Sequence, residues 1–196
     1  MTSWWFIITV VAIVILLILG LKFFYRYPDY NNHITKLKLN ENNLYSPAHG
    51  VVSDIKHDEE KDETLVSIFL NVYDIHHQYS PCSGIVKMLE YHDGSFNPAG
   101  FFEKTRDNER MKITITHKND NDTTDEIITV TQIAGLIARV IQTDVKENQS
   151  IKQGDYLGMI KLGSRVDITF PTSKYILQVK EGMRVSGLNN IIASHM

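Results

Sequence analysis

The sequence predicts a mainly β protein of the α+β class, in which one N-terminal transmembrane helix precedes a compact β-barrel or β-sandwich domain. One long uncharged apolar run lies within the first 26 residues. After residue 44, short runs of β-branched and aromatic residues are separated by Gly, Asn, Asp or Pro, a pattern typical of strands and turns. The 196 residues are 43% apolar and 22% charged, which provides for one anchor and one domain with its own core.

The anchor is predicted over residues 1–26. Residues 4–21 carry no charge, and about twenty apolar residues are what the hydrocarbon core of a bilayer requires. A cleaved signal peptide is disfavoured because no basic residue precedes the run and no small-residue cleavage site follows it. Lys22 and Arg26 follow the run, so the positive-inside rule predicts a single-pass membrane protein with its domain on the cytosolic side. The polar, Asn-rich residues 27–43 are predicted to be a tether.

The β domain is predicted over residues 44–196. Its clearest strand-like runs are 65–72, 111–116, 127–131 and 165–170. The stretch 132–142 has apolar residues at a helical spacing that would equally fill a buried strand, so both interpretations stay open. A weak internal repeat relates 145–154 to 179–187, since each leads from Val-Lys-Glu to a glycine. Both segments resemble the hairpins of biotinyl and lipoyl barrels, but neither has the lysine turn that carries the cofactor there.

Composition argues against several functional classes. The net charge is -3 and the basic residues are scattered, so we expect no nucleic acid as a partner. Cys82 is the only cysteine, which excludes an internal disulfide and favours a reducing compartment. No metal site is predicted, because Cys82 has no companions at zinc spacing and the acidic run 119–125 lacks the Gly and closing Glu of a calcium loop.

The most informative pair for chemistry is Gly163-Ser164. A glycine gives the backbone unusual freedom directly before a hydroxyl residue, which suits a strained peptide bond attacked by its own side chain. Gly-Ser alone is a common turn pair, so the interpretation depends on its surroundings. The pair lies within residues 158–167, which read Gly-Met-Ile-Lys-Leu-Gly-Ser-Arg-Val-Asp.

Six segments, in order, resemble sequence blocks of phosphatidylserine and archaetidylserine decarboxylases. They are residues 46–50 (Ser-Pro-Ala-His-Gly), 68–84, 91–99, 108–110, 132–139 and 158–167. The resemblance spans about residues 44–190. It is greatest to the short, archaetidylserine decarboxylase-like branch, in which Gly-Ser-Arg-Val-Asp is usual.

This resemblance implies a phosphatidylserine decarboxylase that makes phosphatidylethanolamine. The hydroxyl of Ser164 would cut the chain after Gly163 into chains 1–163 and 164–196, and Ser164 would become a covalent pyruvoyl group. That cofactor supplies the electron sink that pyridoxal phosphate supplies elsewhere. The implied partners are phosphatidylserine or a related serine phospholipid, the membrane, and a second copy of the chain in a homodimer.

Two histidines complete the predicted catalytic set. His76 matches the family histidine implicated in decarboxylation and is predicted to donate a proton; the alternative is a strand-end histidine bonded to backbone. His77 should point to the opposite side of its strand and lie at the surface. His49 occupies the position of the family's Asp, and Tyr79 the position of a second His or an Arg. His49 is therefore predicted to take the proton of Ser164 itself.

These departures leave a second function open. Intact Ser164 and His76 favour the enzyme, whereas His49 and Tyr79 favour an unprocessed pseudoenzyme. Such a pseudoenzyme would act as a membrane-tethered module that binds phospholipid or a protein partner.

Overall fold

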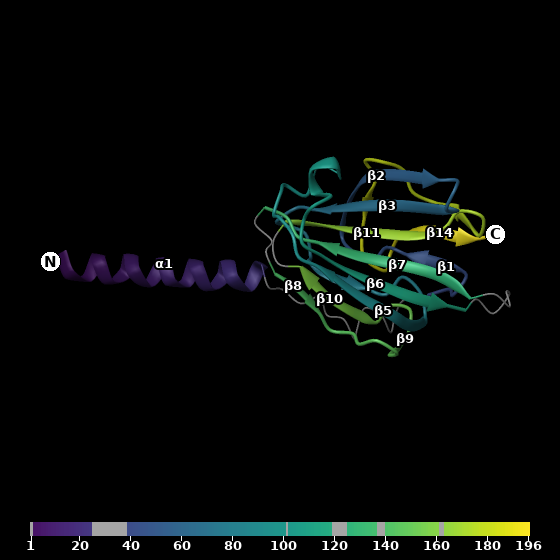
Figure 1. The fold of residues 1–196 in the computed structure, drawn as a ribbon. Helices are drawn as coiled ribbons and strands as arrows, with labels where there is room; N and C mark the ends of the chain where they lie inside the picture. Colours follow the sequence, from purple (N-terminus) through teal and green to yellow (C-terminus); the bar gives the residue numbers. More distant parts are fainter. Residues whose placement is uncertain (1, 25–38, 101, 119–124, 137–139, 161–162) are drawn as a thin grey trace.

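A computed structural model describes residues 2–24, 39–100, 102–118, 125–136, 140–160 and 163–196 (Figure 1). Within these residues, helix α1 (Thr2–Phe24) is followed by a domain of strands and one short 3-10 helix, η1 (Phe102–Thr105). The prediction of a mainly β domain is confirmed.

The largest element is an antiparallel sheet of eight strands, in the order β13-β2-β3-β11-β7-β6-β5-β9. Its strands are β2 (Gly50–Asp58), β3 (Glu63–Leu70), β5 (Gly84–His92), β6 (Arg110–His117), β7 (Glu126–Ile133), β9 (Ser150–Ile151), β11 (Ser164–Pro171) and β13 (Arg184–Val185). The sheet is curled (Figure 1), but over the described residues its edge strands β13 and β9 do not pair with each other. It is therefore a strongly curved sheet rather than a closed barrel.

Two sheets of three strands complete the domain. One has the order β1-β14-β12, formed by β1 (Asn43–Tyr45), β14 (Ile191–His195) and β12 (Tyr175–Leu177). The other has the order β4-β10-β8, formed by β4 (His77–Tyr79), β10 (Tyr156–Ile160) and β8 (Ile141–Thr143). Each small sheet belongs to one of two structural repeats of the domain, and its central strand, β14 or β10, is the last strand of that repeat.

The predicted internal repeat is confirmed by this topology, and it extends over the whole domain. One repeat comprises β1 to β3 and β11 to β14, and the other comprises β4 to β10. Taken in sequence order, their strands occupy equivalent places in the sheets, and β11 and β7 lie side by side in the middle. Equivalent bonds join equivalent residues. The Glu181 carboxylate accepts the N–H of Ile55 at 3.0 Å, and the Glu147 carboxylate accepts the N–H of Leu89 at 2.9 Å.

The core lies between the large sheet and the two small ones. Its fully buried side chains come from all three sheets, as Leu44 of β1, Leu157 of β10 and Ile168 of β11 illustrate. Along β11, Val166, Ile168 and Phe170 alternate with side chains of the other face, as a strand requires. Burying each such side chain stabilises the fold by roughly 1.5–3 kcal/mol.

The N-terminal prediction needs correction. Residues 2–24 do form a helix, but the structure does not support a membrane span. In the part of the chain it describes, no helix is both long and apolar enough to cross a membrane. Most of the predicted tether 27–43 and of the run 119–125 lies outside the described residues. For the stretch 132–142, whose spacing fits either a helix or a strand, the structure shows the end of β7 and the beginning of β8. Residues 137–139 lie outside the described part.

Candidate active site

Ser164 is the first residue of β11, which lies between β3 and β7 near the middle of the large sheet (Figure 1). It pairs with Leu70, and its side chain is fully buried, pointing to the same side of the strand as Val166. In the described part of the chain its Oγ has no hydrogen-bond partner. A buried hydroxyl without a partner costs about 1–3 kcal/mol, so its presence calls for a functional explanation.

Gly163 has a left-handed backbone and contacts a histidine. Its φ is +74°, a conformation that glycine adopts without strain. Its N–H donates to Nε2 of His76 at 2.8 Å, and Nδ1 of His76 donates to the carbonyl of Asp74 at 2.8 Å. The imidazole is thereby the Nδ1–H tautomer, with Nε2 facing the predicted cut. His76 is 4% exposed, so the structure brings Gly163, Ser164 and His76 together in a buried site.

Sequence reasoning missed Gly135, which lies against the peptide between Gly163 and Ser164. A Cβ added at Gly135 would lie 2.3 Å from the carbonyl oxygen of Gly163, so a larger residue there would displace the scissile peptide. The only signal in the sequence was its place in the 132–139 block. Asn108 supports the neighbouring chain, since its Nδ2 donates to the carbonyls of Asn97 and Ala134, both at 2.8 Å.

His49 and Tyr79, the two departures from the family pattern, contact each other. Their ring centroids are 6.3 Å apart at an interplanar angle of 75°, an edge-on arrangement. Neither hydrogen-bonds to Ser164, whose Oγ has no such partner in the described chain. His49 directly precedes β2, which is separated from β11 by β3, so the two strands lie about 10 Å apart.

The expectation for His77 is wrong. This residue is 3% exposed, and its Nδ1 lies 3.2 Å from the hydroxyl of Tyr156. All three residues of β4 are buried, so alternation along this strand exposes neither side. Burial lowers the pKa of His77, and the neighbouring His76 lowers it further. His77 therefore faces Tyr156 rather than the predicted cut.

An apolar hollow of about 250 Å³ opens beside Gly163. It is lined by Phe69, Asn71, Val72, Pro98, Ala99, Gly100, Leu136 and Gly163. Seven of these eight residues are apolar or glycine, and only Asn71 has a polar side chain. The hollow therefore suits an uncharged, hydrocarbon-like group next to the scissile peptide.

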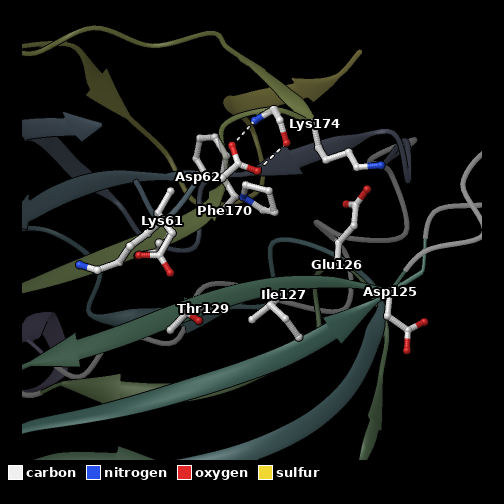
Figure 2. A pocket seen from close by; sticks show the side chains of 12 residues that line it. Lys61, Asp62, Asp125, Glu126, Ile127, Thr129, Phe170 and Lys174 are labelled. Atoms are coloured by element: carbon white, nitrogen blue, oxygen red, sulfur yellow. Dashed lines mark hydrogen bonds between the residues drawn. The ribbon is translucent and has the colours of Figure 1, made fainter. Parts of the chain in front are cut away.

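Two features elsewhere do not belong to this site. A hollow of about 330 Å³ at the other end of β11 is lined by charges of both signs, including Lys61, Asp62 and Lys174 (Figure 2). It lies beside Phe170, roughly 20 Å along the strand from Ser164. Cys82 is fully buried, and burial raises the pKa of its thiol, so it is no nucleophile.

The site thus combines a left-handed glycine, a buried serine whose hydroxyl has no partner in the described chain, and a histidine on the adjoining peptide. These are the groups that a protein needs to cut its own chain at a serine. Comparison with known proteins makes the assignment more specific. The family model of phosphatidylserine decarboxylase matches residues 22–193, and the chain belongs to this family.

Its relatives carry the name phosphatidylserine decarboxylase proenzyme. The one from Wolbachia sp. subsp. Brugia malayi is 40% identical over 164 residues, which cover 79% of this chain and 69% of the relative. The one from Ehrlichia chaffeensis is 39% identical over 155 residues, covering 76% and 66%. The one from Chlorobaculum tepidum is 41% identical over 129 residues, covering 66% and 56%.

Proposed function

We propose that the chain is a phosphatidylserine decarboxylase proenzyme, which cuts itself between Gly163 and Ser164 and then converts phosphatidylserine to phosphatidylethanolamine and carbon dioxide. One observation carries this function: the buried, unpaired Ser164 hydroxyl follows a left-handed glycine held by His76 in a member of this family.

Self-cleavage needs only groups of the chain itself and water. Ser164 Oγ attacks the carbonyl carbon of Gly163, the amide nitrogen of Ser164 takes a proton, and the peptide becomes an ester. Elimination across Cα–Cβ of Ser164 releases the Gly163 carboxylate. Water then replaces the amine, which leaves as ammonia, and a pyruvoyl group heads the chain 164–196.

The surroundings of Ser164 fit this group. The side chain is enclosed, His76 Nε2 lies at the adjoining peptide, and the apolar hollow opens beside it. The pyruvoyl group supplies an electron sink for the loss of carbon dioxide. We assign to His76 Nε2 the proton that the product carbon receives, since Nδ1 is fixed on the carbonyl of Asp74.

The test uses full-length protein purified in detergent. Intact-mass measurement should show a fragment of residues 164–196 that is blocked to Edman chemistry, and the protein should release carbon dioxide from carboxyl-labelled phosphatidylserine. An uncut, inactive chain would support the unprocessed binding module instead, which no observation in the described structure favours over the enzyme.

His49 is proposed as the base of self-cleavage. The support is its contact with Tyr79, which puts both departures from the family in one cluster. We expect the rate of cutting to rise from pH 5 to pH 8, because only a neutral imidazole accepts a proton. His49→Ala should slow the cut by about a hundredfold or more, which is the contribution of a general base.

The control is His49→Asp, which restores the family residue but leaves no histidine at Tyr79 for the carboxylate to orient. It should restore little of the rate. A gel time course measures all three proteins, and equal rates in wild type and His49→Ala would remove His49 from the mechanism.

We also propose that α1 attaches the domain to a membrane, with the domain on the cytosolic side. The apolar side chains between Trp4 and Leu19 are exposed around the whole helix, and so large an uncovered apolar surface marks a contact site. A lipid partner agrees with Lys22 at the domain end of the helix. We expect the full chain to sediment with the membrane fraction, and deletion of residues 2–26 to release it; a full chain that stays in the supernatant would refute attachment.

A further inference from the structure

Arg165 follows the scissile bond and is buried on the opposite face of β11 from Ser164. Side chains alternate across a strand, so Ser164 points to the core while Arg165 and Asp167 point to the other side of the large sheet. Arg165 is only 4% exposed and Asp167 only 5%. Arginine is almost never buried to this degree unless it is paired, so its partners show what it holds.

Three groups hold the guanidinium of Arg165. Its Nη2 donates to Oδ2 of Asp167 at 3.0 Å, while Nε forms an ion-pair contact with Oδ1 at 2.8 Å in which the N–H is not aimed at the oxygen. Its Nη1 donates to Oγ1 of Thr105. The ring of Phe102 has its centroid 4.6 Å from Cζ, within the range of a cation–π contact. The contacts of Arg165 with Thr105 and Phe102 thus join β11 to η1.

Residues 97–100 and 102–105, here called the η1 segment, lie over the start of β11. Gly100 packs on the ring of Phe69, since a Cβ built there would lie 3.6 Å from the ring. A Cβ built at Gly135 would lie 3.2 Å from Ala99 and 2.3 Å from the carbonyl oxygen of Gly163. The η1 segment also supplies three of the residues that line the apolar hollow. It is therefore a wall of the site, and Arg165 ties it to β11.

The cut changes what holds residue 164 in place. In the intact chain, the peptides on both sides of Ser164 fix its position. After the cut it is the first residue of the chain 164–196, and chain ends are poorly ordered unless they are tied down. The remaining ties are the pairing of Ser164 with Leu70 and of Arg165 with Phe69 and Ile133, together with the side-chain contacts of Arg165.

We propose that Arg165, through Thr105 and Phe102, is a positioning residue that fixes the new chain end against the η1 segment for decarboxylation. The inference rests on the proposed function and assigns this task to the arginine of the Gly-Ser-Arg-Val-Asp run. Self-cleavage does not depend on it, because the uncut backbone already holds Ser164. The tie therefore acts on turnover rather than on processing.

The test removes the tie without leaving a buried charge alone. Arg165→Ala would strand Asp167 in the interior and risk misfolding, so the variant is Thr105→Val, which keeps the shape and the Arg165–Asp167 pair. We expect a complete cut, a kcat lower by roughly ten- to a hundredfold, and a nearly unchanged KM for short-chain phosphatidylserine. Thr105→Ser, which keeps the hydroxyl, should restore kcat.

The matched control is Thr129→Val on β7, a similarly buried threonine that makes none of these contacts, and its kcat should equal that of the wild type. If Thr105→Val does not fold, Phe102→Leu removes the stacked ring, keeps the hydrogen bonds, and should show the same split. If the wild type cuts and turns over, and Thr105→Val or Phe102→Leu has the same kcat, the inference about Arg165 is wrong while the proposed function stands. A wild type that neither cuts nor releases carbon dioxide overturns the proposed function, and the inference with it.

Discussion

Ser164→Ala should leave the chain whole and abolish decarboxylation. The variant has no Oγ to attack Gly163, so neither the ester nor the pyruvoyl group can form, and we expect turnover to fall by more than roughly a thousandfold. The same change should stabilise the uncut protein by about 1 kcal/mol, because it removes a buried hydroxyl that has no partner in the described chain. Intact mass, release of labelled carbon dioxide and urea unfolding measure the three effects.

The matched control is Ser150→Ala, which changes an exposed serine of β9. It should cut, turn over and unfold as the wild type does. A fragment beginning at position 164 in the Ser164→Ala protein would show that another group cleaves the chain, and the assignment of Ser164 would then be wrong.

The two products of the cut should remain together in one domain. The chain 164–196 supplies β11, which is paired on both sides by strands of the long chain, and β14, which pairs with β1. A buried contact at the far end adds to this, since Glu126 accepts from the hydroxyl of Tyr175 at 2.5 Å and lies 3.0 Å from Nε2 of His195. Separation of the chains therefore requires unfolding of the central sheet.

The long strands could be predicted from sequence because their signal is local. The runs 111–116, 127–131 and 165–170 lie inside β6, β7 and β11, each of which extends at most two residues further at either end. Alternation of apolar and polar residues over five or more positions is readable without knowledge of the partner strand. Strands of two or three residues, such as β4 and β9, have no such signal and exist only because a neighbouring strand pairs with them.

The same distinction between local and distant signals applies to the residues of the active site. Ser164 and His76 could be named from sequence because they stand in recognisable blocks. The contact between Gly135 and Gly163, the pairing of His49 with Tyr79 and the burial of His77 depend on chain segments that are distant in sequence and meet only in the fold. The error at His77 shows this directly, since alternation states only that neighbours differ in direction and not that one direction is solvent.

His76→Gln should cut normally but lose turnover. The glutamine Oε1 can accept the N–H of Gly163 as Nε2 of His76 does, so the peptide that precedes the scissile bond keeps its contact. An amide cannot deliver a proton to the product carbon, and we expect kcat to fall by about a hundredfold or more. The comparison with His76→Ala, which loses the contact as well, separates proton transfer from support of the peptide: both variants should lack turnover, and only the alanine variant should also cut more slowly.

The control for this prediction is His77→Gln, which changes the adjacent histidine that faces Tyr156 rather than the cut. It should process and turn over within about threefold of the wild type, since its side chain takes no part in the chemistry. Two outcomes would contradict the assignment in different ways. Normal release of carbon dioxide by a cut His76→Gln protein would show that another group donates the proton, whereas an uncut His76→Gln protein would make His76, rather than His49, the base of self-cleavage, because Nε2 is then needed for its proton affinity and not only for its hydrogen bond.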